Sequence, residues 1–208
     1  MNLLIVNGEG FAPDAALLRL FTALRREKLE KLKTAQGREQ SAAAEMAFLL
    51  ARPAGAADYF YGENGKPQTE GGYLSLSHAG PYGLCAWSAE PVGADIEREN
   101  QSLRRLARRL FAPDEAEDDP LLTWCAKESY VKLTGEGLSR PFPSLRIEDG
   151  RVLDARGETL ARVFTGTIGA YRFCVCSREA ACAAPVILTA RDAACRLREK
   201  YRLPGETP

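Results

Sequence analysis

The chain has 208 residues, 45% of them hydrophobic and 27% charged, which is typical of a globular protein with a sizeable core. Its 28 basic and 28 acidic residues leave no net charge, so no overall field draws it toward nucleic acid or an anionic membrane. The apolar run after Met1 is too short for a signal-peptide core and no stretch could cross a bilayer, so we expect a cytoplasmic protein with neither nucleic acid nor membrane as a partner.

The first half of the chain predicts helices and short strands. Residues 2–6 are apolar enough for a buried strand, and apolar residues recur at helical spacing after Pro13. The basic residues that follow alternate with glutamates, a pattern more typical of a solvated helical face than of a binding site. Another helix is predicted over Arg38–Arg52. Strands are then predicted at Tyr59–Tyr61, Gly72–His78, Leu84–Ser88 and Val92–Glu97.

The second half begins with an amphipathic helix, Leu103–Phe111. Its polar face carries four arginines, Arg104, Arg105, Arg108 and Arg109. We interpret this face as a hydrated surface, with a docking surface as the alternative. A second helix is predicted from Pro120, capped by Asp119, to about Thr134. The remaining elements are strands at Leu145–Glu148, Val152–Asp154, Thr159–Phe164, Tyr171–Ser177 and Val186–Leu188, and a helix at Ala190–Tyr201.

Each half of the chain therefore has the same order: a strand, then helices, then antiparallel strands. This order predicts an α+β fold of two pseudo-symmetric lobes, each a small antiparallel sheet with helices. We place the lobes at residues 1–91 and 92–208. We expect the active site in the cleft between them.

Two acidic motifs would meet at that cleft. In a strand alternate side chains share a face, so Asp95 and Glu97 point to the same side. In a helix residues four apart share a face, so Trp124, Glu128 and Lys132 form one stripe. If strand and helix pack together, three carboxylates converge beside a lysine. Such a site suits a divalent cation that holds a phosphorylated substrate.

A fixed order of motifs adds a resemblance to a known family. The motifs are Gly65-Lys66-Pro67, Leu76-Ser77-His78, Gly93-Ala94-Asp95-Ile96-Glu97, Phe111 with Glu115, and Trp124 to Lys132. This order resembles the surfactin-type 4′-phosphopantetheinyl transferases over roughly residues 25 to 140. The departures from the family pattern are small side chains: Ala79, Ala94, Cys125 and Ser129.

The resemblance implies a monomer that binds coenzyme A and Mg²⁺ and transfers the 4′-phosphopantetheine group to a serine of an apo carrier protein, releasing adenosine 3′,5′-bisphosphate. It implies that Asp95, Glu97 and Glu128 are metal ligands and that Lys132 contacts the phosphates of the coenzyme. From the position of Glu128 between Trp124 and Lys132 we expect Glu128 to be both ligand and base, so Glu128 and Lys132 are the predicted catalytic residues. The implied coenzyme-binding residues are Lys28, Lys31, Arg38, Lys66, Ser77, His78 and Lys132.

Two other functions fit parts of this pattern. A metal-dependent phosphodiesterase or nuclease also uses Asp-x-Glu beside a lysine, but the chain has no net positive charge to favour a nucleic-acid groove. A non-catalytic module that binds coenzyme A or a carrier would have no need of three carboxylates with Lys132.

Overall fold

The structure is a computed structural model that describes residues 1–62, 64–111, 115, 119–137, 140–178, 182 and 184–203. The described helices are α1 (Ala15–Leu20), α2 (Ala23–Lys31), α3 (Ala35–Ala51), α4 (Gln101–Leu110), α6 (Pro120–Thr134), α7 (Ala190–Tyr201) and the short 3₁₀ turn Phe142–Ser144. The described strands are β1 (Asn2–Asn7), β2 (Phe60–Tyr61), β3 (Pro67–Gln68), β4 (Tyr73–Ala79), β5 (Tyr82–Ser88), β6 (Val92–Arg98), β7 (Arg146–Glu148), β8 (Arg151–Leu153), β9 (Thr159–Ile168), β10 (Tyr171–Ser177) and β11 (Val186–Thr189).

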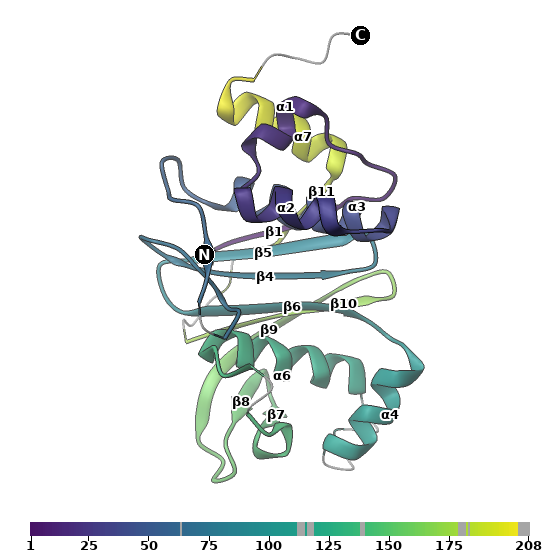
Figure 1. The fold of residues 1–208 in the computed structure, drawn as a ribbon. Coiled ribbons are helices and arrows are strands. Elements are labelled where there is room, and N and C mark those ends of the chain that lie inside the picture. Colours follow the sequence, from purple (N-terminus) through teal and green to yellow (C-terminus); the bar gives the residue numbers. More distant parts are fainter. Residues whose placement is uncertain are drawn as a thin grey trace.

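Two sheets lie between two helical layers, with α3 covering one sheet and α6 the other (Figure 1). The first sheet has the order β11-β1-β5-β4 and the second β6-β10-β9-β8-β7, and β2 and β3 form a separate two-stranded hairpin. The antiparallel order β1-β5-β4 of the first sheet recurs as β6-β10-β9 in the second. The prediction of an α+β fold with two similar antiparallel sheets is confirmed.

The last two elements return to the first sheet. Strand β11 pairs in parallel with β1, and α7 packs against α3. The ammonium of Lys200 donates to the carbonyls of Leu49 (2.8 Å) and Arg52 (2.7 Å), which satisfies backbone acceptors at the end of α3. The division at residue 92 stays a prediction, and the chain beyond Val186 lies with the first sheet rather than the second.

Three hydrophobic clusters hold the layers together. One lies between α3 and the first sheet, another between α6 and the second sheet, and the third lies between the sheets and includes Ile5, Leu84, Ile96 and Val175. Because the buried residues of this last cluster come from β1 and β5 of one sheet and from β6 and β10 of the other, it holds the two sheets together. Strand β4 lies beside β6, as Figure 1 shows. Among the described helices, none is both long enough and apolar enough to pass through a bilayer.

Glycine allows α6 to approach β6 closely. A Cβ atom added at Gly93 would lie 1.9 Å from the Ser129 carbonyl oxygen and 2.3 Å from the Leu133 nitrogen, both of them helix backbone atoms. Helix α6 is capped by the Asp119 side chain at its start and ends at Gly135, whose φ of 78° is left-handed. These features place Glu128 and Lys132 over the strand that carries Asp95.

Candidate functional site

Elements from both halves of the chain line one cavity of about 500 Å³. Its walls come from α2, the β2–β3 hairpin, β4, β6 and α6. Of the residues predicted for the site, all but two line this cavity, namely Lys28, Lys66, Ser77, His78, Asp95, Glu97, Glu128 and Lys132. The two exceptions are Lys31 and Arg38. The strand and the helix that carry the acidic motifs therefore meet as the sequence predicts.

Asp95 lies at the centre of the polar contacts in this cavity. Its side chain is 2% exposed, and its Oδ1 accepts hydrogen bonds from the Lys132 ammonium (2.6 Å) and the Ser77 hydroxyl (2.7 Å). Lys132 also donates to the Ser77 oxygen at 3.0 Å. The other carboxylate oxygen, Oδ2, is buried and has no hydrogen-bond partner among the described residues. A buried carboxylate oxygen without a donor is unfavourable unless a cation or another ligand satisfies it.

The charges around Asp95 oppose one another. Burial and then the charge of Asp95 raise the pKa of Glu97 to about 7 and also raise the pKa of Glu128. Burial disfavours the Lys132 ammonium, but the attraction of Asp95 and Glu128 outweighs it, so the pKa of Lys132 is raised. Mutual repulsion of the carboxylates indicates that the cavity accommodates one more positive charge.

The three carboxylates fit a Mg²⁺ ion by chemistry, since they are oxygen donors and the buried Asp95 Oδ2 has no hydrogen-bond partner among the described residues. As the side chains lie, however, no three His, Cys, Asp or Glu residues of the described chain are close enough together to form a metal site. Asp95, Glu97 and Glu128 therefore share a cavity, and joint coordination of one ion by them remains a prediction.

His78 lies at the mouth of the cavity with part of its side chain exposed. Burial among neighbouring atoms and then the charges of Lys28, Arg25 and Lys132 lower its pKa to about 4. Solvent at the exposed edge screens part of this effect. In the folded protein without ligand, His78 is therefore a neutral hydrogen-bonding group at pH 7 and not a cation.

An NMR titration of the His78 ring is expected to show a midpoint below the ordinary value of 6.5 and toward about 4. Because folding lowers this pKa, the unfolded state binds more protons between the two values, and stability is lost as the pH falls through that interval. His78→Gln should remove this part of the pH dependence. A ring that titrates at or above 6.5 in the folded protein would contradict the surroundings described here.

The hairpin from the first half of the chain reaches the end of α6. The Lys66 ammonium donates to the Leu133 carbonyl (2.6 Å), and the Asn64 amide donates to the Gly135 carbonyl (3.1 Å). A lysine at a helix C-terminus satisfies open carbonyls and the negative end of the helix dipole. Lys66 thus joins the hairpin to α6 as well as lining the cavity.

Arg25 also lines the cavity, and the sequence analysis did not select it. Its guanidinium is 3% exposed and is held by the buried carboxylate of Glu45 (3.0 Å), the Tyr59 hydroxyl (3.0 Å) and the Ser41 hydroxyl (3.0 Å). Its position three residues before Lys28 on one helix was the signal available. The alternating charges of this segment predicted a solvated helical face. One of its cations, Arg25, is instead buried and held in place.

Lys31 and Arg38 do not line this cavity. Lys31 is exposed and forms a surface ion pair with Glu27 at 3.8 Å. Arg38 donates to the Leu32 carbonyl (2.8 Å) and lines a separate cavity of about 470 Å³ beside Phe11 and Leu29. Their predicted role in coenzyme binding stays a prediction, and this structure places both residues outside the cavity that holds the other predicted site residues.

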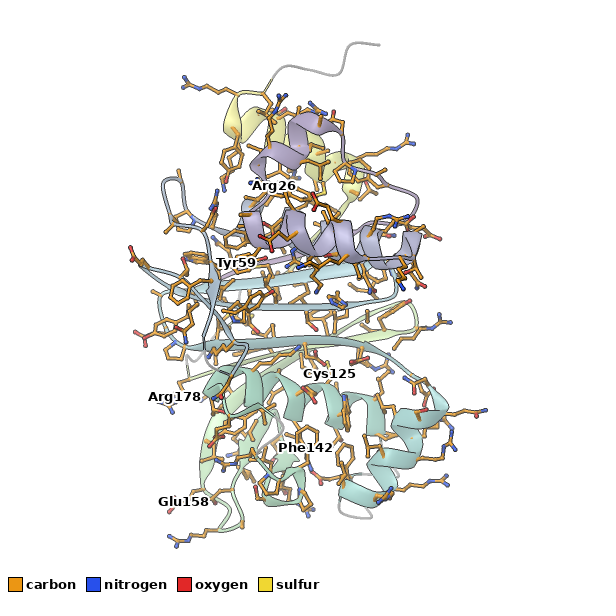
Figure 2. The ribbon with its side chains drawn as sticks, viewed as in Figure 1. Arg26, Tyr59, Cys125, Phe142, Glu158 and Arg178 are labelled. Carbon is orange, nitrogen blue, oxygen red and sulfur yellow. The ribbon has the colours of Figure 1, made fainter. Side chains whose placement is uncertain are left out.

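Lys127 and Glu115 form a buried pair on the other side of α6. The Lys127 ammonium lies 2.9 Å from the Glu115 carboxylate and 4.4 Å from the centre of the Phe111 ring, and it also donates to the Phe142 carbonyl. Cys125 lies on the opposite side of α6, where its thiol donates to the Asp95 carbonyl. Figure 2 labels Cys125 on this side of the helix and Phe142 on the side of Lys127. Lys127 therefore fixes α6 within its lobe, while Glu128 beside it lines the cavity.

Comparison with known proteins points to one family. A family model described as the 4′-phosphopantetheinyl transferase superfamily matches residues 91–184, which include β6 and α6. The chain is 31% identical to the 4′-phosphopantetheinyl transferase Sfp of Bacillus subtilis (strain 168) over 44% of this chain and 47% of that protein. It is 33% identical to the 4′-phosphopantetheinyl transferase psf-1 of Bacillus pumilus, over 64% of this chain and 66% of that protein.

A further 4′-phosphopantetheinyl transferase of Bacillus subtilis is 28% identical over 64% of this chain and 71% of its own length. The chain thus spans about half the length of the first of these relatives and about two thirds of the others. The family-model match includes the strand with Asp95 and Glu97 and the helix with Glu128 and Lys132. The family model and these relatives together support a surfactin-type 4′-phosphopantetheinyl transferase, the family that the motifs of this chain indicate.

Proposed function

We propose that this chain transfers the 4′-phosphopantetheine group of coenzyme A to a serine of an apo acyl- or peptidyl-carrier protein, acting with Mg²⁺ as a cytoplasmic monomer. The observation that carries this proposal is the single cavity in which three carboxylates face Lys28, Lys66 and Lys132. Such a cavity suits a ligand with several phosphate groups and a divalent cation. Family membership supports the same reaction.

The reaction exchanges one oxygen at phosphorus for another. The serine oxygen forms a bond to the phosphorus that carries the pantetheine arm, and the bond from that phosphorus to the bridging pyrophosphate oxygen breaks. Adenosine 3′,5′-bisphosphate leaves with the electron pair of that bond. A Mg²⁺ ion, held by Asp95 with Glu97 and Glu128, would supply charge neutralisation at the phosphoryl oxygens.

The chain's own residues orient the reactants and move the proton. Lys132 and Lys66 line the cavity as cations that attract the pyrophosphate. The charge of Arg25, which lines the same cavity, is paired with Glu45. Glu128 accepts the proton of the attacking serine hydroxyl. An ordinary glutamate, whose pKa is near 4.3, is a weak base for an alcohol, so the proton transfer to Glu128 is concerted with attack on phosphorus or relayed through a water molecule.

Mass measurement of an apo carrier protein tests the function directly. Incubated with this protein, Mg²⁺ and coenzyme A, the carrier should gain one phosphopantetheine group, and it should gain nothing when EDTA replaces Mg²⁺. An unchanged carrier together with cleavage of a phosphodiester substrate would favour the phosphodiesterase. An unchanged carrier with bound coenzyme A and no cleavage would favour a binding module.

The exposed arginines of α4 are the proposed docking surface for the carrier. All four are exposed, and only Arg104 has a described ion pair, with Glu99 at 2.6 Å. Carrier docking helices are usually acidic, so complementary charge would speed association. Reversing two of these charges (Arg105→Glu with Arg108→Glu) should raise the Michaelis constant for the carrier several-fold, at low salt above all, and leave that for coenzyme A unchanged.

Steady-state kinetics with each substrate varied in turn measure this effect. Arg162→Glu with Arg151→Glu, a pair of exposed arginines opposite each other on the neighbouring strands β8 and β9, serves as a matched reversal on a different surface. If both Michaelis constants stay at the wild-type values in the α4 variant, the arginines are ordinary surface.

A further inference from the structure

Two buried serines join the two sheets where their edges meet. Ser75 and Ser77 are two residues apart on β4, so they share a face of that strand, and they are 3% and 8% exposed. Strand β6 lies beside β4 but belongs to the other sheet (Figure 1). Both serine hydroxyls form hydrogen bonds with residues of β6, in place of the backbone hydrogen bonds that join neighbouring strands within one sheet.

Ser75 binds both backbone groups of one residue. Its oxygen accepts a hydrogen bond from the Ala94 amide at 2.8 Å, and its hydroxyl donates to the Ala94 carbonyl at 3.3 Å. Ala94 is fully buried, so water cannot replace these bonds. The peptide immediately before Asp95 is therefore held by a side chain of the other sheet.

Asp95 is thereby fixed from two directions. On one edge of β6, Asp95 is opposite Cys174 of β10 in the antiparallel ladder. On the other edge, Ser75 holds the neighbouring Ala94, while Ser77 accepts from the Ile96 amide at 3.4 Å and donates to Asp95 Oδ1. With Oδ1 occupied by Ser77 and Lys132, the remaining oxygen Oδ2 is the one available to a ligand.

We propose that Ser75 is a positioning residue for the cation site: its hydroxyl fixes the Ala94 peptide and so sets where Asp95 Oδ2 lies in the cavity. This inference rests on the proposed function for the cation itself. Among the described hydrogen bonds, those of Ser75 go to Ala94 and none goes to Asp95. Partners that orient metal ligands from behind typically change metal affinity 10- to 100-fold when removed.

Three variants separate positioning from ordinary packing. Ser75→Ala removes the hydroxyl, and Ser75→Thr keeps it on a side chain suited to a strand. Ser88→Ala is the matched control, because Ser88 is also buried at 2% exposure in the same sheet but bonds only locally, to the Glu90 amide among the described contacts. Asp95→Ala supplies the reference for a lost cation site.

Two measurements are made on the full chain, with Mn²⁺ as the probe because its free concentration can be read by electron paramagnetic resonance. We expect Ser75→Ala to weaken Mn²⁺ binding about tenfold or more. We expect Ser75→Thr and Ser88→Ala to stay within about twofold of the wild type. Hydrogen exchange at the Ala94 amide, followed by NMR, should accelerate in Ser75→Ala and not in Ser88→Ala.

The outcomes distinguish this inference from the proposed function. Wild-type Mn²⁺ binding in Ser75→Ala, or an equal loss in Ser88→Ala, overturns the positioning role and leaves the proposed function standing. If the wild type binds Mn²⁺ no better than Asp95→Ala, the cation site of the proposed function fails, and the role of Ser75 fails with it.

Discussion

Replacing Glu128 with Gln is expected to lower kcat for phosphopantetheine transfer by about 10²- to 10⁴-fold, the range for loss of a general base. Gln keeps the size of the side chain and cannot accept the serine proton. Coenzyme A binding should weaken only modestly, because Lys66, Lys132 and the other cations of the cavity are unchanged. Single-turnover kinetics give the chemical step, and calorimetry with coenzyme A gives the dissociation constant.

Glu136→Gln is the matched control for this change. Glu136 lies just past the end of the same helix, where it forms an exposed ion pair with Arg140 at 3.3 Å, and it does not line the cavity. Its substitution should leave both kcat and binding unchanged. Near-normal turnover in Glu128→Gln would remove the proposed base, and a large loss of coenzyme binding would assign Glu128 to binding.

Substituting Gly93 with Ala is expected to destabilise the fold by about 3 kcal/mol, at the upper end for overpacking a core. The added methyl group would lie within 2.3 Å of two backbone atoms of α6, and backbone cannot move aside as a flexible side chain can. Helix α6 would have to move away from β6. Glu128 and Lys132 would then separate from Asp95, so activity should fall in the fraction that remains folded.

Gly62→Ala tests whether any glycine would show this effect. Its added methyl group would meet the end of the Gln68 side chain, which can rotate away, so the free energy of unfolding should change by less than about 1 kcal/mol. Urea denaturation measures both variants. If Gly93→Ala unfolds at the same urea concentration as the wild type, the close packing of α6 on β6 is wrong.

Local patterns predict much of this fold correctly. The strand Val92–Glu97 and the final helix Ala190–Tyr201 lie where the alternation and the helical spacing place them. Helix α6 begins and ends as its Asp119 cap and Gly135 predict. In these cases the signal lies within a few neighbouring residues, and the tertiary structure agrees with it.

Features that depend on distant contacts were not predictable in the same way. Thr22 caps a new helix and divides the helical pattern predicted after Pro13, since its hydroxyl accepts from the Arg25 amide. That break sets which residues of α2 face the cavity. The parallel pairing of β11 with β1 joins segments about 180 residues apart, and no local pattern specifies such a register.

The site shows the same contrast. The acidic strand and helix were predictable because each is regular, so their shared faces follow from spacing alone. Whether Arg38 or Arg25 faces the cavity depends on how the early helices pack, and the resemblance to the family is looser there. The hydrogen bonds between Ser75 and Ala94 could not be predicted from spacing either, because they form where two separate sheets come into contact.

A crystal structure with coenzyme A and Mg²⁺ tests the central claim most directly. The account predicts that the pyrophosphate lies in the cavity between β4, β6 and α6, close to Lys132, with a metal ion on Asp95 and the acidic residues beside it. Coenzyme A bound elsewhere, for example in the separate cavity beside Phe11, or a Mg²⁺ ion that does not touch Asp95, would contradict it.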